Sequence, residues 1–522
     1  MDELAIVESI RPLLAISCPF ICVFLILLFR KQPNIRESCT MLASIMQFLI
    51  VFSMAPIIVA GNVVECPLFT IFTGLDFIFR VDAFGLIFAF TSSFLWILVS
   101  SYSIGYMRSL HEHAQTRYYA CFAIAIFGAV GIALSKNLIT MYFFYEALTI
   151  STYPLVAHNG LAEWGHKQEQ TEQAEEARFA GRKYLAYLLT SGWFFFVAIV
   201  LTFYLTGTTD FENGGILTVA SASRLTLMLL FALFMLGSMK AAYMPFHSWL
   251  PTAMAAPTPV SALLHAVAVV KAGVFVVVRV VCYIYGVDLM GALGLGIILA
   301  SLAAFTMIVA SLIAIAQDNL KKRLAYSTIS QLSYILFGVA LLNTMGVQGA
   351  MLHIPFHGFM KITLFMCAGA IIVVTGKKNV SEMAGLGRTM PVTMVAFSIG
   401  ALGMSGIPPV CGLISKWYLA LGTLDAHALG LLAVLLVSSL LDVVYFFPII
   451  YTAFFGKPEP EKWTDGGNKN SNKKPEIKEA SIFMLVPLTL TAIFSIVFCL
   501  FPNTFYILEL AKLAVAGLGG GV

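Results

Sequence analysis

The chain has 522 residues, of which 59% are hydrophobic and only 11% are charged, and its mean hydropathy is +0.90. A typical soluble domain carries about 25% charged residues, so this composition excludes an ordinary soluble protein and indicates a polytopic membrane protein. The formal net charge of +4 does not indicate nucleic-acid binding, and it fits basic loops beside a membrane surface.

The first residues, MDELAIVESIRP, are acidic and lack the basic region and cleavage site of a signal peptide. We therefore expect the first apolar run to remain as a membrane span. Further apolar runs follow, each long enough to cross about 30 Å of hydrocarbon. They predict an all-α integral membrane protein with about fourteen transmembrane helices, near residues 10–29, 40–60, 83–103, 118–134, 137–157, 184–206, 225–243, 260–282, 289–316, 325–343, 349–375, 391–424, 431–455 and 480–501.

The lysines and arginines test this count of spans. Of 31 in total, 21 fall in alternate loops, six fall on the opposite side, and four lie within helices. By the positive-inside rule the basic loops face the cytoplasm, and both termini face outward (periplasmic) from the cell inner (plasma) membrane. Two basic loops are long and polar: residues 158–183 are expected to form a short surface helix, and residues 457–479 have the composition of a flexible loop.

Glu146 lies well inside an apolar run, LITMYFFYEALTISTYPLVAH. A carboxylate buried there must be protonated or paired with a cation, which makes Glu146 a candidate proton carrier. Lys240 lies in LGSMKAAYMPFHSWLP, beside prolines that break a helix, and a lysine at bilayer depth costs about 3 kcal/mol or more. We expect Glu146 and Lys240 to form a pair through which a proton moves. The alternative is a buried Glu146 satisfied by neighbours such as Tyr142 and Thr149.

Five more titratable residues occupy two later spans. His265 and Lys271 lie six residues apart on the eighth span, whereas His353, His357 and Lys361 recur every four residues in MLHIPFHGFMKITLF. The second set therefore shares one helix stripe, as stepwise proton transfer through a dry interior requires. The alternative for His265 is a hydrogen-bonded core histidine. We expect Lys271 to approach the stripe through water, because two lysines cannot comfortably both be charged in a dry interior.

Lys416 follows a second proline break, in SGIPPVCGLISKW. Its proline comes before the lysine, whereas the proline near Lys240 comes after it, and this mirrored order predicts two inverted repeats. The alternative is a lysine that reaches out from a helix end. The expected units are N-terminal helices at 1–117, a first repeat at 118–282, a second repeat at 289–455, and a loop with a last helix at 456–522.

Two further acids are possible accessory groups. Asp82 opens the third helix and Asp442 lies near the start of the thirteenth, and either could pair with a basic residue. The nine cysteines show no metal-type spacing, and no glycine-rich nucleotide motif follows a strand. The sequence therefore predicts no metal site, no cofactor and no redox centre in this chain.

Several stretches together resemble one family: FYEALTISTYPLV, MKAAYMPFHSWLPTAMAAPTPVSALLHA, DNLKKRLAYSTISQLSY, HGFMKITLFMCAGA and SGIPPVCGLISKWYL. They are similar to the antiporter-type subunits of NADH:quinone oxidoreductase and of Mrp Na⁺/H⁺ antiporters, and the details look most like the D-type Mrp subunit. The resemblance covers roughly residues 80–455. It implies fourteen helices, two inverted five-helix repeats, and breaks in helices seven and twelve.

The resemblance also implies roles for the titratable residues. Glu146 and Lys240 would form the pair of a first half-channel, and Lys271 would connect the halves. His357 and Lys361 would continue a central hydrophilic axis. Lys416 would lie on the outlet side of the second half.

Three functions remain open from the sequence. The first is a proton-translocating subunit of a multisubunit Mrp-type cation (Na⁺)/H⁺ antiporter, with other membrane subunits as partners. The second is a membrane-arm subunit of an NADH:quinone oxidoreductase or membrane-bound hydrogenase complex, again without a redox centre of its own. The third is a non-conducting membrane scaffold.

Overall fold

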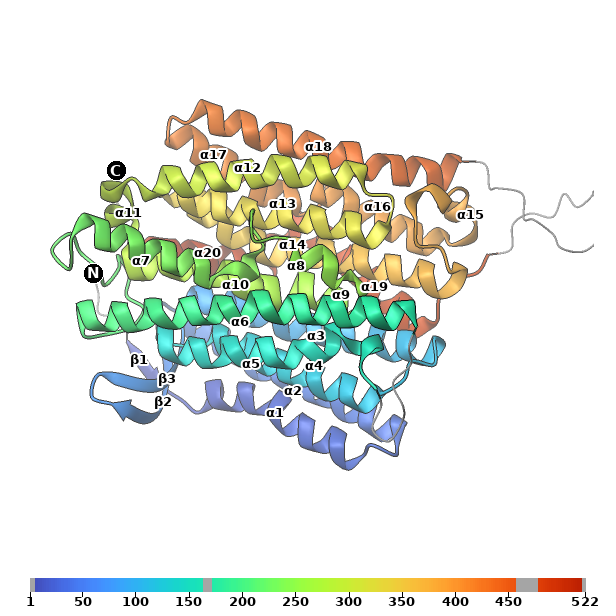
Figure 1. Cartoon of the computed structure of the whole chain (residues 1–522), viewed down its shortest axis with the longest axis horizontal. Helices are drawn as coiled ribbons and strands as arrows, with labels where there is room; N and C mark the ends of the chain where they lie inside the picture. The colour runs from blue at the N-terminus through green and yellow to red at the C-terminus, as the bar shows by residue number, and fades with distance from the viewer. Residues whose placement is uncertain (1–4, 163–170, 457–476, 519–522) are drawn as a thin grey trace, which may run out of the picture.

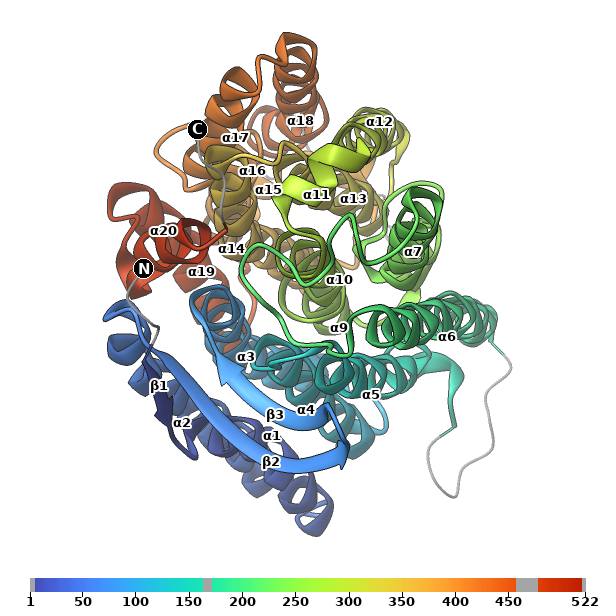
Figure 2. The ribbon, with the colours of Figure 1, turned by 90° about the vertical axis from the view of Figure 1, so that its left-hand side faces the viewer.

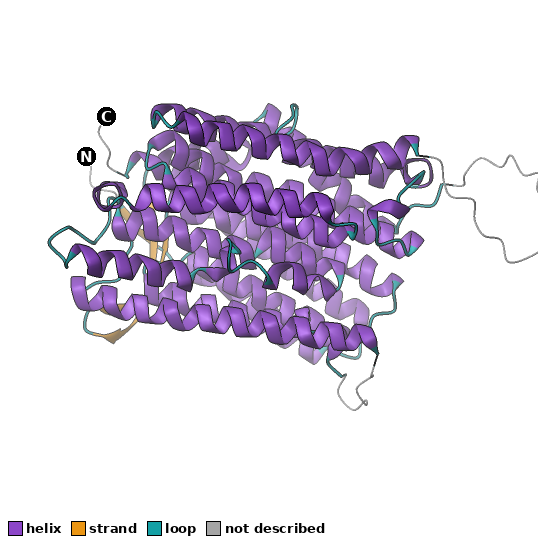
Figure 3. Ribbon diagram, turned by 45° about the horizontal axis from the view of Figure 1, so that its top comes forward, coloured by secondary structure: helices purple, strands orange, loops and turns teal. Residues whose placement is uncertain are grey.

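The computed structural model describes residues 5–162, 171–456 and 477–518. Helices dominate it and run almost parallel to the long axis of the molecule (Figures 1 and 3). Figure 2, turned by 90°, looks along these helices and shows them packed side by side around a central group that includes α9, α10 and α14. The expected all-α membrane fold is confirmed.

Ten helices of the described chain are long and apolar enough to cross a membrane. Two more helices and two broken pairs bring the crossings to the expected fourteen within the described ranges. The ten are α1 (Arg11–Leu28), α2 (Pro33–Val59), α3 (Ala83–Ser109), α4 (Gln115–Ala133), α6 (Glu172–Thr206), the segment Thr258–Tyr285, α12 (Leu295–Ala316), α14 (Thr344–Thr375), α18 (Leu429–Phe455) and α19 (Ile482–Leu500). The others are α5 (Leu138–Val156), α13 (Leu320–Ala340), α7 (Arg224–Gly237) with α8 (Trp249–Thr252), and α16 (Pro391–Met404) with α17 (Gly412–Asp425).

Helices seven and twelve are broken where the prolines predicted it. The first break separates α7 from α8 and contains only the 3₁₀ turn η2 (Met239–Ala241), and the second lies between α16 and α17. Backbone groups freed by a break within a membrane must find partners inside the protein. At the second break, the Nζ of Lys416 donates to the carbonyl oxygen of Met404, 2.7 Å away. A lysine thus satisfies part of the interrupted helix.

The segment Thr258–Tyr285 forms the centre of the molecule. It is continuous from α9 (Thr258–Ala262) through the π-helix η4 (Leu263–Val267) and α10 (Val269–Arg279) to a second π-helix, η5 (Val280–Tyr285). Every residue in its most apolar stretch is buried. In the most apolar stretches of α1, α2 and α18 only about a third of the residues are buried. The outer helices expose large apolar side chains, as expected of surfaces that face lipid.

A small sheet at one end of the bundle was not predicted. Its strands are β1 (Ile6–Glu8), β2 (Val63–Phe72) and β3 (Leu75–Val81); β1 pairs with β2 in parallel and β2 pairs with β3 antiparallel. Figures 1 and 2 place it beside the ends of the first helices. The sequence patterns assign no element to these residues, which lie before the first expected span and between the second and third.

The polar loop 158–183 also differs from expectation. Residues 158–160 form the 3₁₀ turn η1, and residues 163–170 lie outside the described residues. From Glu172 the chain is already the 35-residue helix α6, so the expected separate surface helix is instead the first part of a transmembrane helix. Most of the loop 457–479 also lies outside the described residues. The remaining short elements are η3 (Ala253–Ala255), α11 (Val287–Leu293), η6 (Val380–Glu382), α15 (Leu386–Thr389), η7 (Thr504–Tyr506) and α20 (Ile507–Ala516).

Candidate functional site

Asp442 is the centre of a buried polar network. Its Oδ2 accepts hydrogen bonds from Lys416 Nζ and from Gln331 Nε2, each at 2.8 Å, and its Oδ1 accepts one from the Tyr445 hydroxyl. Asp442 is completely buried and Lys416 is 7% exposed. The expected pairing of Asp442 with a basic residue is confirmed. Its expected place near the start of the helix is wrong, because Asp442 lies midway along α18, at membrane depth.

From Asp442 the network extends to α14 through Gln331. The Oε1 of Gln331 lies 3.1 Å from Nε2 of His353, and Nδ1 of His353 lies 2.8 Å from the Ser415 hydroxyl. The rings of His353 and His357 are stacked, with centroids 5.7 Å apart. Nδ1 of His357 then lies 2.7 Å from Nζ of Lys271 on α10. Buried titratable groups therefore follow one another from the central segment to the second broken helix.

Lys361 joins the same centre by a second route. Its Nζ donates to the Ser327 hydroxyl at 2.8 Å, and the Tyr445 hydroxyl lies 2.9 Å from the same oxygen. Because Tyr445 also binds Asp442, one acid connects Lys361 and Lys416. All members of this branch are buried.

The expectation that Lys271 approaches the stripe only through water is wrong. Lys271 contacts His357 directly. An ammonium group can only donate hydrogen bonds, and the Nδ1 of a neutral imidazole can accept one. Lys361 is bonded to Ser327 instead, so the two lysines avoid direct contact by binding neutral partners.

The first half holds its acid and base differently. Lys240 is completely buried in η2, where its Nζ donates to the Tyr145 carbonyl oxygen and lies 3.1 Å from the centroid of the Tyr145 ring. Glu146 is the next residue along α5, yet the described residues contain no Lys240–Glu146 ion pair within 4.0 Å. The two groups are near enough for their charges to interact. The two groups are therefore neighbours, as expected, but they do not form a direct ion pair in the described chain.

A glycine shapes the site of Glu146. The Oε1 of Glu146 is buried and has no hydrogen-bond partner in the described chain. A Cβ added to Gly192 of α6 would lie 2.1 Å from that oxygen, far inside van der Waals contact. The carboxylate therefore occupies space that only a glycine at position 192 leaves open.

His265 lies outside the hydrogen-bonded network. It belongs to the π-helix η4, where neither ring nitrogen has a hydrogen-bond partner within the described ranges, and its ring packs 4.6 Å from that of Phe365. Isolated π-helical turns are frequent at functional sites. Its buried, unpaired nitrogens lie near enough to Lys361 for electrostatic interaction.

Asp82 forms an ion pair with Arg279, outside the hydrogen-bonded network described above. Its side chain caps α3 by accepting from the Gly85 amide at 2.7 Å, and it accepts two hydrogen bonds from the Arg279 guanidinium. Aromatic rings, including Phe275 and Tyr283, surround that guanidinium. Pairing with a basic residue is confirmed, and the geometry is that of a helix cap bound to a neighbouring span.

Sequence reasoning missed the neutral members of the network: Ser327, Gln331, Ser415 and Tyr445. Ser327 and Gln331 lie four residues apart in the quoted stretch DNLKKRLAYSTISQLSY, so they share one face of α13. That spacing was the available signal. Uncharged polar residues are common in buried helices, however, and only the fold shows that these four join charged groups.

Comparisons with known proteins agree with this architecture. The family described as NADH:quinone oxidoreductase/Mrp antiporter, TM, matches residues 135–442, which include both broken helices and Asp442. The chain belongs to this family. It is thus a multi-pass, proton-translocating membrane subunit of the Mrp antiporter or complex I-like type, and its relatives are subunits of multisubunit membrane complexes.

Individual relatives come from both branches of the family. The chain is 32% identical to NADH-quinone oxidoreductase subunit N of Desulforudis audaxviator, over 70% of this chain and 71% of that protein. It is 30% identical to the A-type subunit of the Na⁺/H⁺ antiporter of Alkalihalophilus pseudofirmus, over 85% of this chain but only 55% of that protein. A chain in the structure of the Mrp complex from Dietzia sp. DQ12-45-1b has the same fold, with a TM-score of 0.83, 21% identity and 98% of each chain covered.

Proposed function

We propose that this chain is the proton-translocating subunit of an Mrp-type Na⁺/H⁺ antiporter, of the D-type kind. The observation that carries the proposal is a row of buried polar groups that leads from Lys271 to Lys416. Its neighbours are hydrogen-bonded except at His357 and His353, whose rings are stacked with centroids 5.7 Å apart. Buried charge is costly in a membrane protein and is kept where ions or protons move.

In this proposal each group receives a proton from one neighbour and passes it to the next. Lys240 and Glu146 take up the proton in the first half of the molecule. Lys271 then passes a proton to His357. His353 and Gln331 then connect the histidines to Asp442, and Lys416 releases the proton on the side to which its 7% exposure opens. His265 and Lys361 act on the axis through their charges and through Ser327 and Tyr445.

A second candidate is the membrane arm of an NADH:quinone oxidoreductase. The relative from Desulforudis audaxviator supports it, because that protein is named as such a subunit and is covered over 71% of its length. The two proposals differ in the partners that supply energy. The antiporter relative from Alkalihalophilus pseudofirmus supports the first candidate, because the match to it extends over 85% of this chain.

Purification of the full complex with its native partners separates the two candidates. We expect Na⁺ added to proteoliposomes to drive proton efflux without NADH, because an antiporter couples the two ion gradients directly. Proton movement that requires NADH and quinone would support the respiratory complex. Absence of any proton movement in an intact complex would support a scaffold and overturn both.

We further propose that the chain spans the plasma membrane with its termini outside, and that residues 118–282 and 289–455 are inverted repeats. The charge bias supports the first proposal, and the two broken helices, each with a buried lysine near its break, support the second. A cysteine introduced at Asn470, outside the described residues, should resist an impermeant thiol reagent in intact cells. Labelling from outside would reverse the orientation.

A further inference from the structure

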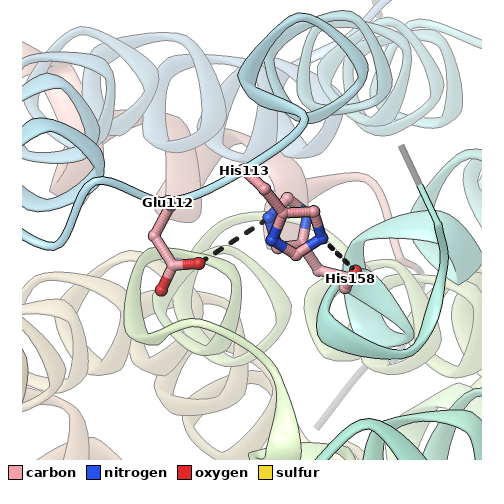
Figure 4. A group of neighbouring side chains, drawn as sticks. All are labelled: Glu112, His113 and His158. Atoms are coloured by element: carbon pink, nitrogen blue, oxygen red, sulfur yellow. Dashed lines mark hydrogen bonds and ion pairs between the residues drawn. The ribbon is translucent and has the colours of Figure 1, made fainter. Parts of the chain in front are cut away.

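A second cluster of titratable side chains lies apart from the proton network. Glu112 and His113 occupy the turn between α3 and α4, and His158 occupies η1 just after α5. Figure 4 shows the two imidazoles side by side with the Glu112 carboxylate directed toward them. One candidate ligand atom from each residue lies within 4.8 Å of the other two.

The His158 ring is a buried polar group without a hydrogen-bond partner in the described chain. It is completely buried, and neither of its ring nitrogens has a hydrogen-bond partner in the described chain. In its neutral form such a ring carries a free lone pair, which is the state that binds metals. A buried polar ring without a partner is costly and requires an explanation.

The hydrogen bond of His113 fixes which of its ring nitrogens is free to bind a metal. Its Nε2 lies 3.2 Å from the carbonyl oxygen of His158, so Nε2 must donate and Nδ1 must keep its lone pair. Metal-binding histidines usually donate their other ring N–H to a carbonyl or carboxylate in this way. The Oε2 of Glu112 lies 4.0 Å from Nε2 of His158 and supplies the negative charge.

We propose that Glu112, His113 and His158 bind a divalent transition-metal ion of the Zn²⁺ class. Two imidazole nitrogens and one carboxylate oxygen suit Zn²⁺ better than Mg²⁺ or Ca²⁺, which prefer oxygen ligands. Tetrahedral ligands at the usual Zn–N distance lie about 3.3 Å from one another. We expect the partly exposed side chains of Glu112 and His113 to rotate and close this gap when the ion binds, with water as the fourth ligand.

Such a site was invisible in the sequence. His113 and His158 are 45 residues apart and come from different turns. The bound ion would hold the chain at the C-terminal end of α5. Glu146 lies on the same helix, about 18 Å from His158 along the helix axis. This inference does not depend on the proposed direction or partner of transport.

Zinc binding by the full-length purified chain, prepared without a polyhistidine tag and stripped of metal, tests the proposal. We expect one Zn²⁺ per chain in equilibrium dialysis, and visible ligand-field absorption when Co²⁺ replaces it. His113→Asn and Glu112→Gln should each weaken binding by about tenfold or more, because even residues that only support a ligand contribute about 10–100-fold to affinity. The matched control is His111→Asn, in the same turn but outside the cluster.

His158→Asn removes a buried side chain and can prevent folding, so the two surface-reaching variants carry the test. Hydrogen exchange gives an independent reading: Zn²⁺ should slow exchange of residues 110–114 and 157–162 in the wild-type chain and in His111→Asn, but not in His113→Asn. Equal zinc affinity in all variants, or no binding by the wild-type chain at micromolar Zn²⁺, would overturn the assignment.

Discussion

The two halves of the molecule each place an acid beside a buried lysine near a broken helix, but they hold the acid differently. In the second half, Asp442 and Lys416 form a direct ion pair at 2.8 Å, and Gln331 and Tyr445 complete the shell of the carboxylate. In the first half, Lys240 binds the Tyr145 backbone and ring, and the nearby Glu146 keeps one oxygen without a partner among the described residues. We call the arrangement of the second half a closed pair, because the acid and the lysine bind each other directly. We call that of the first half an open pair, because the acid and the lysine are neighbours without a direct ion pair.

This difference separates two uses of a buried charge. A closed pair is costly to break, because removing one partner leaves the other buried without compensation. An open pair contributes little to stability, but its groups can exchange protons without first breaking an ion pair. We therefore expect variants of the second half to damage both folding and transport, and variants of the first half to damage transport alone.

The largest effect is expected from Asp442→Ala. It leaves Lys416 unpaired and should lower the free energy of unfolding by about 3–5 kcal/mol, as well as abolish proton transport. The double variant Asp442→Leu/Lys416→Met should recover most of the stability but none of the transport, because apolar side chains replace both charges. Thermal unfolding of the purified complex and proton flux in vesicles measure the two properties. Equal melting temperatures for the single and double variants would show that the pair is not closed.

Glu146→Gln should reduce transport by about tenfold or more while stability stays within about 1 kcal/mol of the wild type, since no ion pair is lost. The same two measurements apply. Asp288→Asn, which changes an exposed acid at the start of α11, is the control and should affect neither property. A loss of stability as large as that of Asp442→Ala would mean that Glu146 is a structural partner and that the contrast between the halves is wrong.

The sequence predicted the parts of this comparison better than their connections. Apolar runs located the fourteen spans and prolines located both breaks, because each of these features determines the structure of the residues next to it in the sequence. Charged residues at membrane depth identified Glu146, Lys240 and Lys416 for the same reason. Which acid meets which lysine depends on how distant helices pack, and no local pattern records that Lys416 and Asp442 are in contact while Lys240 and Glu146 are not.

Most contacts that the sequence did not predict involve uncharged polar residues. Gln331 and Tyr445 look like ordinary buried polar residues in sequence, although they link Asp442 to His353 and to Lys361 through Ser327. The sheet β1–β3 was hidden because short strands between long apolar helices give a weak periodic signal. The direct contact of Lys271 with His357 was hidden because repulsion between lysines predicts separation, whereas a neutral imidazole can accept a hydrogen bond from one of them.

Lys361→Arg tests whether the branch to Asp442 needs a proton or only a positive charge. Guanidinium keeps its proton throughout the physiological range, so an arginine at this position would preserve the charge without releasing a proton. We expect transport to fall about fivefold or more, nearly as far as in Lys361→Ala, which corresponds to about 1 kcal/mol on the barrier. Proton flux at matched expression measures it. A fully active Lys361→Arg complex would show that the position supplies only a fixed charge.

The smallest expected effect concerns the open pair itself, through Gly192→Ala. The added methyl would lie 2.1 Å from Oε1 of Glu146, so the carboxylate must move out of the space beside α6. Alanine also favours a helix over glycine by about 1 kcal/mol, which opposes any loss of stability from crowding. We therefore expect a stable protein whose transport falls about two- to fivefold, because the acid is displaced but not removed.

Gly430→Ala is the matched control for this last variant. It makes the same substitution in α18, where a new Cβ would meet no atom within 4 Å, and it should leave transport unchanged. Adding Glu146→Asp to Gly192→Ala shortens the acid by one methylene and makes room for the methyl group. If the position of the carboxylate is what matters, the double variant should transport at least as well as Glu146→Asp alone. Equal losses from Gly192→Ala and Gly430→Ala would instead show that transport responds to helix stiffness, and the open arrangement of Glu146 would have no special role.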